Sequence, residues 1–365
     1  MIPYGDGEQA VDVVGAFEEV GLEYAPIRKG CVLFDMPHAG TLIARGTERL
    51  DFLNNMVTQR VVDLTEGQSC DSFWLSRKGR VDADMRLSDR GDHTIMTLDR
   101  HLAKATAESL TNYVFSEDVT IEDCSETQHV MALHGVGALA VLAAAAENSA
   151  LASLALFSNA ACEIAGVSAT AERDDLTGEP GVALRMARED AETVYDALLQ
   201  LRAGVPSVKA AGWFAINSAR IEAGRPLYNM DFGSDSLPAE TGVIDLRVDF
   251  KKGCYLGQEV VARMDARKAR KRGVVAIRIA PDPETAETPL PSLGDRLYRV
   301  DDSSGDPIGA VTSSTISPML SGASVAFATV RDKETKPGTE LMVSAEGKRA
   351  TATVQDNLVL WSRSG

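Results

Sequence analysis

The chain has 365 residues, of which 44% are hydrophobic and 25% charged, and its formal net charge is −16. This composition is typical of a globular protein with a sizeable core, and the length suggests two or three domains. The acidic balance opposes general nucleic-acid binding, because neutralising phosphates requires a basic surface. The most apolar stretch, residues 130–150, is interrupted by His134 and two glycines and is too short to span a membrane. The N-terminus lacks the positive charge of a signal peptide, so we expect a cytoplasmic protein.

The first 272 residues mix helical and strand-like patterns without the regular alternation of a doubly wound sheet. A helix is predicted over residues 9–21. The polar–apolar alternation of residues 70–76, 80–88 and 92–99, with turns between them, indicates an antiparallel meander. Further along, the patterns predict helices over residues 100–115, 136–146 and 191–203, strands over 129–135 and 181–187, and a helix that ends at Gly224. The class is therefore α+β.

From residue 273 onward, strand-like runs follow one another with no helical pattern between them. Turn-forming residues separate the runs, which predicts an all-β barrel or sandwich. The runs are residues 274–280, 296–300, 307–315, 324–330, 340–345, 349–355 and 357–361. We accordingly divide the chain into residues 1–272, an α+β region, and residues 273–365, a C-terminal β-barrel domain.

Cys254 stands apart from the other four cysteines of the chain. The five form no CxxC pair and are odd in number, so neither a zinc site nor a disulfide framework is indicated. Cys254 comes just before a helix predicted over residues 255–266 and follows Lys251 and Lys252. A helix N-terminus and neighbouring cations both favour the thiolate, the form that attacks electrophiles or binds metal. The alternative is a chance cysteine at a strand-to-helix turn.

A cluster of cationic residues follows this cysteine. Its members are Arg263, Arg267, Lys268, Arg270, Lys271 and Arg272. Such a cluster can bind a polyanionic tail, a nucleic acid or an acidic partner. The alternative is a solvated helix end, which the spacing alone favours.

Two further stretches carry carboxylates that could take part in chemistry. Near the end of the helix before Gly224, a buried Glu222 could accept two N–H donors from a heterocycle, or it could form a structural pair with Arg220. In the strand at residues 80–88, Asp82 and Asp84 share one face because side chains alternate along a strand. They could act as general acid and base, or they could belong to an exposed polar face.

The segment "KGCYLGQEVVAR" resembles the K-G-C-[YF]-x-G-Q-E signature of the YgfZ-type folate-binding proteins. The rest of the chain resembles the superfamily of the glycine-cleavage T-protein and dimethylsulfoniopropionate demethylase. The segments that carry this resemblance are "VLFDMPHAGTLIARGTERLDFLNNMVT", "TGEPGVALRM", "RIEAGRPLYNMD" and "IGAVTSSTISP". The resemblance implies a T-protein-like three-lobed fold with a C-terminal barrel, in which residues 1–272 form two discontinuous lobes. It also implies that tetrahydrofolate, or a substituted folate, binds in a central cavity.

The resemblance also implies roles for particular residues. Asp84 matches the acidic residue that T-proteins place near the reactive pterin nitrogens, although Ala83 replaces the aspartate before it. Glu222 matches the glutamate that holds the pterin edge. The other residues expected to contact folate are Arg220, Tyr228, Lys252 and Arg263, the last two as cations suited to the glutamate tail.

Three functions are consistent with these features. The first is a folate-binding accessory protein that supports iron–sulfur cluster assembly or repair, with Cys254 as reactive thiolate and transient metal ligand and with iron–sulfur enzymes or carriers as partners. The second is a folate-dependent aminomethyltransferase or demethylase, in which Asp84 assists proton transfer and Cys254 is dispensable. The third is a binding module that recruits RNA or an acidic partner through residues 263–272.

Overall fold

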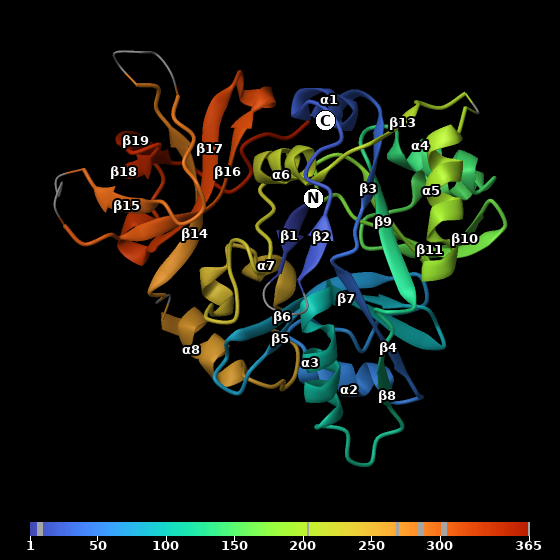
Figure 1. Ribbon diagram of the computed structural model, residues 1–365. Helices are drawn as coiled ribbons and strands as arrows, with labels where there is room; N and C mark the ends of the chain where they lie inside the picture. The colour runs from blue at the N-terminus through green and yellow to red at the C-terminus, as the bar shows by residue number, and fades with distance from the viewer. Residues whose placement is uncertain (6–9, 203, 268–269, 283–287, 301–304, 364–365) are drawn as a thin grey trace. The chain divides into compact units, whose positions relative to one another are not determined.

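The computed structural model describes residues 1–5, 10–202, 204–267, 270–282, 288–300 and 305–363, the side chain of Arg267 excepted (Figure 1). The chain forms two compact units. The first comprises Met1–Lys78, Asp82–Ile216 and Asp245–Gln258, and the second comprises Gly79–Val81, Asn217–Ile244 and Glu259–Gly365. Each unit has hydrophobic clusters of its own. The domain boundary at residue 272 stays a prediction.

A six-stranded sheet forms one half of the first unit. Its strands lie in the order β10 (Asn159–Ile164), β11 (Val167–Arg173), β12 (Gly181–Ala187), β9 (Gln128–His134), β3 (Cys31–Asp35) and β13 (Val208–Ala210). All neighbouring pairs are antiparallel except β13 with β3. Helices α4 (Ala138–Ala145) and α5 (Ala191–Gln200) pack on this sheet, where Val141 and Leu198 join a cluster with Leu33 and Leu133. The two predicted helices and two predicted strands of this region are confirmed.

A five-stranded antiparallel sheet forms the other half of the first unit. Its order is β5 (Ser69–Leu75), β6 (Val81–Asp89), β7 (His93–Asp99), β4 (Ala39–Arg45) and β8 (Thr120–Asp123). Helices α2 (Arg49–Met56) and α3 (Arg100–Thr111) cover one face, and Leu53 and Leu110 pack there against Trp74 and Met85. The meander predicted for β5, β6 and β7 is confirmed.

The predicted helix over residues 9–21 is wrong. Instead, β1 (Ile2–Tyr4) pairs with β2 (Val11–Val13) in an antiparallel ladder, and helix α1 covers Val20–Lys29. The apolar spacing of this segment fits both elements, and pairing with a partner strand decides between them.

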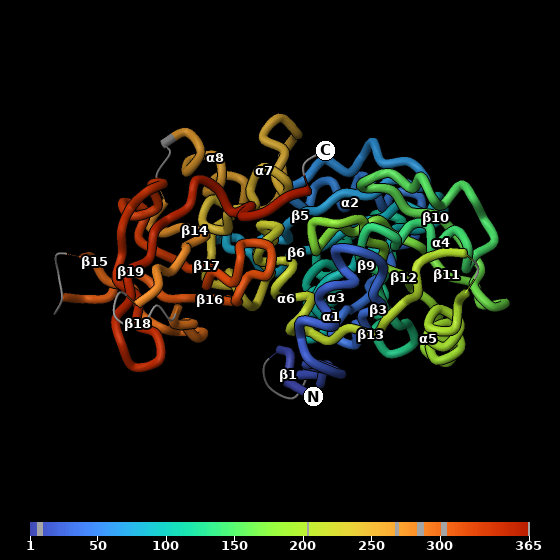
Figure 2. Tube along the Cα trace, turned by 90° about the horizontal axis from the view of Figure 1, so that it is seen from above, coloured from blue at the N-terminus to red at the C-terminus, as the bar shows by residue number. Residues whose placement is uncertain are grey.

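The second unit contains a closed six-stranded barrel, as predicted. Around the barrel the strands are β14 (Arg272–Ile279), β17 (Ala323–Arg331), β16 (Gly309–Ser317), β15 (Arg296–Arg299), β18 (Glu340–Ala345) and β19 (Lys348–Val354) (Figure 2). The seventh predicted strand, residues 357–361, is wrong. Its backbone donors at Leu360 and Trp361 both bond to the carbonyl of Glu222, and its side chains at Leu358 and Leu360 pack on the hydrophobic cluster that contains Ile221.

The remaining helices are short. They are α6 (Trp213–Glu222), α7 (Ile244–Arg247) and α8 (Gln258–Arg267), with 3-10 turns at Ser149–Ser153, Arg188–Asp190, Pro238–Glu240, Pro318–Leu320 and Asp332–Glu334. In the described part of the chain, no helix combines the length and the apolar character that a membrane span requires.

Candidate functional site

The candidate site lies on the polar face of the five-stranded sheet. Along β6, Ala83 and Met85 are buried beneath the helices, whereas Asp82, Asp84 and Arg86 alternate with them and are only partly buried. The prediction that Asp82 and Asp84 share one strand face is therefore confirmed. The alternation brings charged groups to the face that α2 and α3 leave uncovered.

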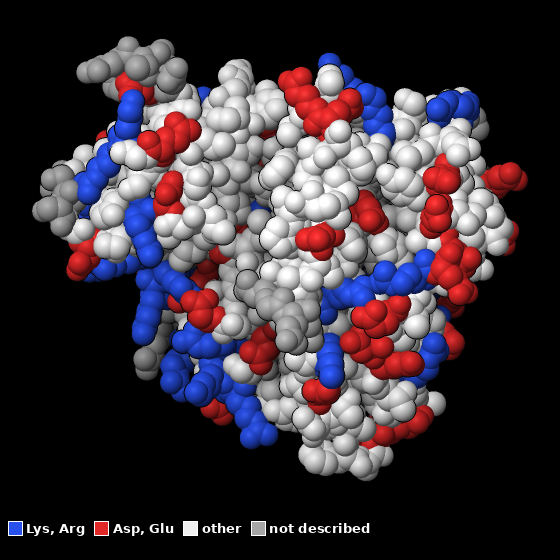
Figure 3. Space-filling model, in the orientation of Figure 1, with Lys and Arg blue, Asp and Glu red and all other residues white. Residues whose placement is uncertain are grey.

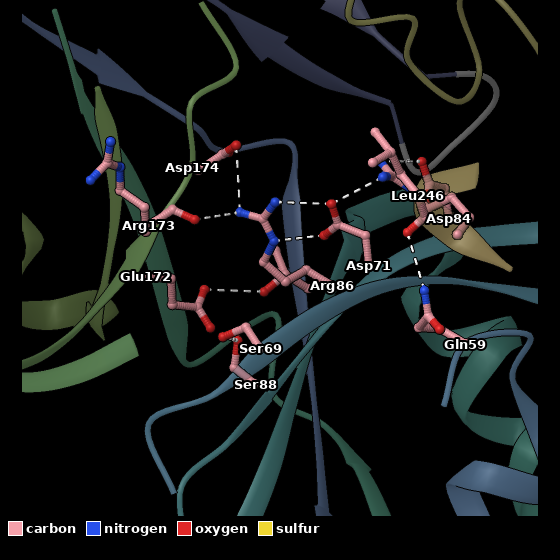
Figure 4. Close-up of polar contacts among 12 residues, drawn as sticks. Gln59, Ser69, Asp71, Asp84, Arg86, Ser88, Glu172, Arg173, Asp174 and Leu246 are labelled. Carbon is pink, nitrogen blue, oxygen red and sulfur yellow. Dashed lines mark hydrogen bonds and ion pairs between the residues drawn. The ribbon is translucent and has the colours of Figure 1, made fainter. Parts of the chain in front are cut away.

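Asp84 is held by an arginine that is not among the predicted site residues. Arg247, the last residue of α7, donates from Nε to Asp84 Oδ1 at 2.8 Å and from Nη2 to Oδ2 at 3.4 Å. The end of α7 is itself fixed, because Thr58 donates its hydroxyl to the carbonyl of Arg247 at 2.6 Å. The Gln59 amide also donates to the carbonyl of Leu246 at 3.5 Å (Figure 4). We call the two-point contact between Arg247 and Asp84 the Asp84–Arg247 fork. It joins β6 and α7, two elements far apart in sequence.

The same arginine continues into a chain of alternating charges. Arg247 Nη1 lies 3.0 Å from Asp71 Oδ2, and Asp71 in turn accepts from Arg86 Nε at 2.7 Å and Nη2 at 3.1 Å. Arg86 also donates to the carbonyl of Arg173 at 2.8 Å and lies 3.5 Å from Asp174. Figure 4 shows Arg86 between Asp71 and Asp174. Two arginines thus alternate with three carboxylates, and Asp84 is at one end of this row of charges.

The electrostatics of Asp84 suit proton exchange. Burial raises the pKa of its carboxyl, Arg247 opposes this rise, and the nearby charge of Asp71 adds to it. Its side chain keeps 15% of its surface exposed, so a ligand can reach it. A carboxylate that is partly desolvated, held in place and accessible can take a proton from a bound amine.

The second unit holds four of the predicted folate contacts. Arg220 and Asp231 are both fully buried and form an ion pair at 2.7 Å, and Arg220 also donates to Ser313 at 2.6 Å. The predicted alternative of an Arg220–Glu222 pair is therefore wrong, since the helical turn presents Arg220 to Asp231 instead. Tyr228 is buried and donates to the carbonyl of Val81 at 3.3 Å.

Glu222 is also fully buried, and its Oε1 accepts hydrogen bonds from Ser317 and from the backbone N–H of Met319, the latter at 3.2 Å. These contacts tie α6 to the turn that follows β16. The roles of Glu222, Arg220 and Tyr228 in folate binding stay predictions. Asp84, Lys252 and Cys254 belong to the first unit, whereas Glu222, Arg220, Tyr228 and Arg263 belong to the second.

The segment around Cys254 differs from the prediction. Helix α8 begins at Gln258, because Gly257 has a φ of +82° and Gln258 accepts a side-chain hydrogen bond from the N–H of Tyr255 at 3.2 Å. The prediction of a helix from residue 255, with Cys254 at its N-terminus, is therefore wrong. The dipole of α8 acts only near the first turn of the helix, and Cys254 lies four residues before that turn, outside its reach. Cys254 is nevertheless exposed.

Lys252 does not accompany the thiol as predicted. Its Nζ donates to the carbonyls of Asn54, Val57 and Gln59 at 2.6–2.7 Å, at and beyond the C-terminal end of α2. Burial lowers the pKa of this ammonium to about 8. On the other side of the cysteine, the N–H of Leu256 donates to the carbonyl of Asn55 at 3.3 Å. Cys254 therefore lies on a loop that is fastened to α2 at both ends.

Part of the predicted basic run is neutralised. Arg270 pairs with Asp332 at 2.7 Å, and Arg272 pairs with Asp235 at 2.7 Å and with Glu240 at 3.4 Å. Arg263 is exposed on α8, and Figure 3 shows basic side chains gathered over this helix. Lys268 and the side chain of Arg267 lie outside the described residues. These ion pairs favour the solvated helix end over a dedicated polyanion site.

Asp71 and Arg247 belong to the site but are not among the residues predicted for it. Asp71 had a usable signal, because a charged residue inside the apolar run "CDSFWLS" is costly to bury without a partner. Arg247 had none, since its partners are distant in sequence. Among the described residues, no group of three or more His, Cys, Asp and Glu could hold a metal ion. Transient metal binding at Cys254 stays a prediction.

Two family models match consecutive parts of the chain and together span most of it. Residues 9–252 match the family model of the GCVT N-terminal domain, and residues 272–359 match that of the glycine cleavage T-protein C-terminal barrel domain. The chain belongs to the glycine cleavage T-protein family. The predicted superfamily and fold are thereby confirmed, whereas membership of the YgfZ-type branch stays a prediction.

Similar proteins span almost the whole chain. An aminomethyltransferase of Geobacillus sp. is 28% identical over 341 residues, which cover 93% of this chain and 89% of that protein. An aminomethyltransferase of Thermotoga petrophila is 28% identical over 351 residues, covering 95% and 90%. The crystal structure of the glycine cleavage system aminomethyltransferase T from Bartonella henselae has a TM-score of 0.81 at 23% identity and covers 94% of this chain and 90% of that one. This last similarity shows the shared fold.

Proposed function

We propose that the protein is a tetrahydrofolate-dependent one-carbon transferase of the aminomethyltransferase kind, with Asp84 as the proton-exchanging residue. The relatives named above are aminomethyltransferases, and this chain matches them over nearly their full length. Aminomethyltransferases of this family use tetrahydrofolate. This function corresponds to the second alternative of the sequence analysis. The observation that carries it is the Asp84–Arg247 fork, which orients an accessible carboxylate whose pKa is raised.

The chemistry requires one proton transfer that Asp84 can perform. The lone pair of a secondary amine of the acceptor forms a new C–N bond to the one-carbon unit, while the bond from that carbon to the donor breaks and its electron pair leaves with the donor. The acceptor nitrogen then loses its N–H proton to the Asp84 carboxylate. Arg247 keeps the carboxylate oriented through both oxygens, which lowers the entropy cost of reaching the reactive arrangement.

Buried groups elsewhere fit a structural role better. Arg220 and Glu222 have no exposed surface, and both hold groups of their own unit together. Lys252 has three carbonyl partners, and Arg263 is solvent-exposed. Folate contacts by these four residues and by Tyr228 remain proposals. Binding measurements on single variants can decide them.

The test is product formation from tetrahydrofolate. The purified protein is incubated with tetrahydrofolate and, separately, an aminomethylated lipoyl protein, methylated amines and a sulfonium donor, and methylene- and methyl-tetrahydrofolate are quantified by mass spectrometry. Asp84→Asn should lower kcat by at least about 100-fold and leave tetrahydrofolate affinity almost unchanged. Asp82→Asn, on the same strand face, is the matched control. Absence of any product across all donors would rule out the transferase.

One observation favours a second function. Cys254 is exposed on a loop that Lys252 and Leu256 fasten to α2, which agrees with the predicted accessory role in iron–sulfur cluster assembly. The deciding experiment measures an iron–sulfur enzyme in cells that lack the protein and carry either wild type or Cys254→Ser. Rescue by wild type alone would establish this role, and equal rescue by both would leave Cys254 incidental.

A further inference from the structure

A second carboxylate, Asp99, lies on the same sheet face as Asp84, at the end of the neighbouring strand β7. The β6–β7 ladder pairs Arg86 with Thr97 and Leu87 with Met96. The ladder ends at Arg86 and Thr97. Because side chains alternate along a strand, Asp84, two residues before Arg86, and Asp99, two residues after Thr97 and the last residue of β7, project from the same face of the sheet. On its other side Asp99 is paired with Ala39 of β4, which contributes only a methyl group.

The charged and titratable groups around Asp99 come from several elements. From β1, the Tyr4 hydroxyl donates to Asp99 Oδ1 at 3.1 Å. The next residue, Arg100, lies 2.6 Å from Glu126, and His101 lies beside Gly5. The other charged groups on this side of the sheet are Arg247, which donates to both Asp84 and Asp71, and Asp71 itself. The ring centroid of His38 lies 4.4 Å from that of Tyr4, and burial lowers the pKa of His38 to about 4.

These partners separate the two carboxyls electrostatically. Arg247 stabilises the charged form of Asp84, whereas the hydrogen bond to Asp99 comes from a neutral phenol. Burial and the charge of Asp84 together raise the pKa of Asp99 to about 7, and the hydrogen bond from Tyr4 opposes this rise. Below about pH 7, Asp99 is therefore mostly neutral. When it ionises above that pH, its negative charge makes Asp84 hold a proton more strongly.

We propose that Asp99 is a positioning residue of the transferase, which acts through Asp84 and, with Tyr4, sets how strongly Asp84 takes up the proton that the acceptor amine loses. This inference rests on the proposed function. The transferred proton passes from the acceptor nitrogen to Asp84 and then to water, so Asp99 neither gains nor loses an atom in the reaction. Ionisation of Asp99 makes Asp84 the stronger base, and turnover should rise with pH through the range in which Asp99 titrates.

A titration that requires no activity tests the pair itself. Carboxyl carbons of aspartates are labelled with carbon-13 and followed by NMR between pH 4 and pH 9. The signal that titrates near pH 7 should vanish in Asp99→Asn, move to lower pH in Asp84→Asn because a like charge is lost, and move to higher pH in Tyr4→Phe because a donor to the charged form is lost. Glu122→Gln, an exposed carboxylate on β8 of the same sheet, should change nothing. An unchanged midpoint in Asp84→Asn would overturn the coupling.

The pH dependence of turnover tests the role. Wild type and Glu122→Gln should show kcat rising through pH 7, whereas Asp99→Asn should lack this rise and be roughly tenfold slower at pH 8. Should Asp99→Asn fold poorly, Tyr4→Phe provides the second variant, and its rise should move to higher pH. An unchanged profile in Asp99→Asn with wild-type turnover intact would overturn the inference and leave the proposed function standing. Absence of turnover in wild type, with the NMR shifts present, would overturn the proposed function and leave the carboxyl pair established.

Discussion

Arg247 binds Asp84 through two nitrogens, with Nε 2.8 Å from Oδ1 and Nη2 3.4 Å from Oδ2, although the two residues are 163 positions apart in sequence. The same guanidinium reaches Asp71, so one side chain at the end of α7 orients two carboxylates of adjacent strands. This relationship places the candidate chemistry on the sheet face that the helices leave free, and the predictions below test its components and its support.

Replacing Arg247 should affect both the proton affinity of Asp84 and stability. Arg247→Met removes the cation that opposes the effect of burial, so the pKa of Asp84 should rise further. Two partly buried carboxylates also lose a partner, and the free energy of unfolding should fall by about 2 kcal/mol. Urea unfolding and carboxyl NMR measure the two effects. Arg60→Met removes an exposed surface pair with Asp63 and should leave stability almost unchanged; equal losses in both variants would contradict the assignment.

Lys252 should stabilise the first unit through its hydrogen bonds. Lys252→Met retains most of the aliphatic stem but leaves the carbonyls of Asn54, Val57 and Gln59 without their shared donor. We expect a loss of about 2 kcal/mol in urea unfolding. Lys251→Met, at the exposed neighbouring position, is the matched control. If the two variants unfold at the same urea concentration, the three carbonyls do not depend on Lys252.

The buried pair of Arg220 and Asp231 should be a main support of the second unit. Asp231→Asn leaves the Arg220 guanidinium charged and without its carboxylate in a site with no exposed surface. The expected loss is about 3 kcal/mol, because an uncompensated buried charge is strongly destabilising. Asp235→Asn lies on the same loop, but its side chain is 71% exposed, so it should cost little. Thermal unfolding followed by circular dichroism compares the two, and a mild effect of Asp231→Asn would show that the site is hydrated.

Asp99 should make stability depend on pH. Its pKa is about 7 in the folded protein and near the ordinary 3.8 in the unfolded chain, so the folded state binds more protons between these values. Stability that depends on this group is therefore present below about pH 4 and is lost as pH rises to 7. Relative to wild type, Asp99→Asn should become more stable over this range, by roughly 4 kcal/mol at pH 8. Urea unfolding at pH 5 and pH 8 measures the change, and a difference that shrinks at pH 8 would show the opposite sign.

Local sequence patterns predicted most of the secondary structure. The barrel strands and the meander of β5, β6 and β7 follow from alternation over several residues, which identifies a strand whatever its partner is. The failures are segments whose partner decides the outcome. Residues 11–13 become a strand because Ile2–Tyr4 pairs with them, and residues 357–361 fail to become one because Glu222 takes two of their N–H donors.

The sequence by itself determined the family, the barrel and the strand face on which Asp84 lies, because motifs, turn residues and the two-residue period of a strand are local properties. The tertiary structure alone decided which charges meet. It assigned Arg247 to Asp84, Asp231 rather than Glu222 to Arg220, and three carbonyls rather than a thiol to Lys252. Side-chain charge is the same wherever a residue lies, whereas the partner that offsets the cost of burying it is set by contacts between segments distant in the chain.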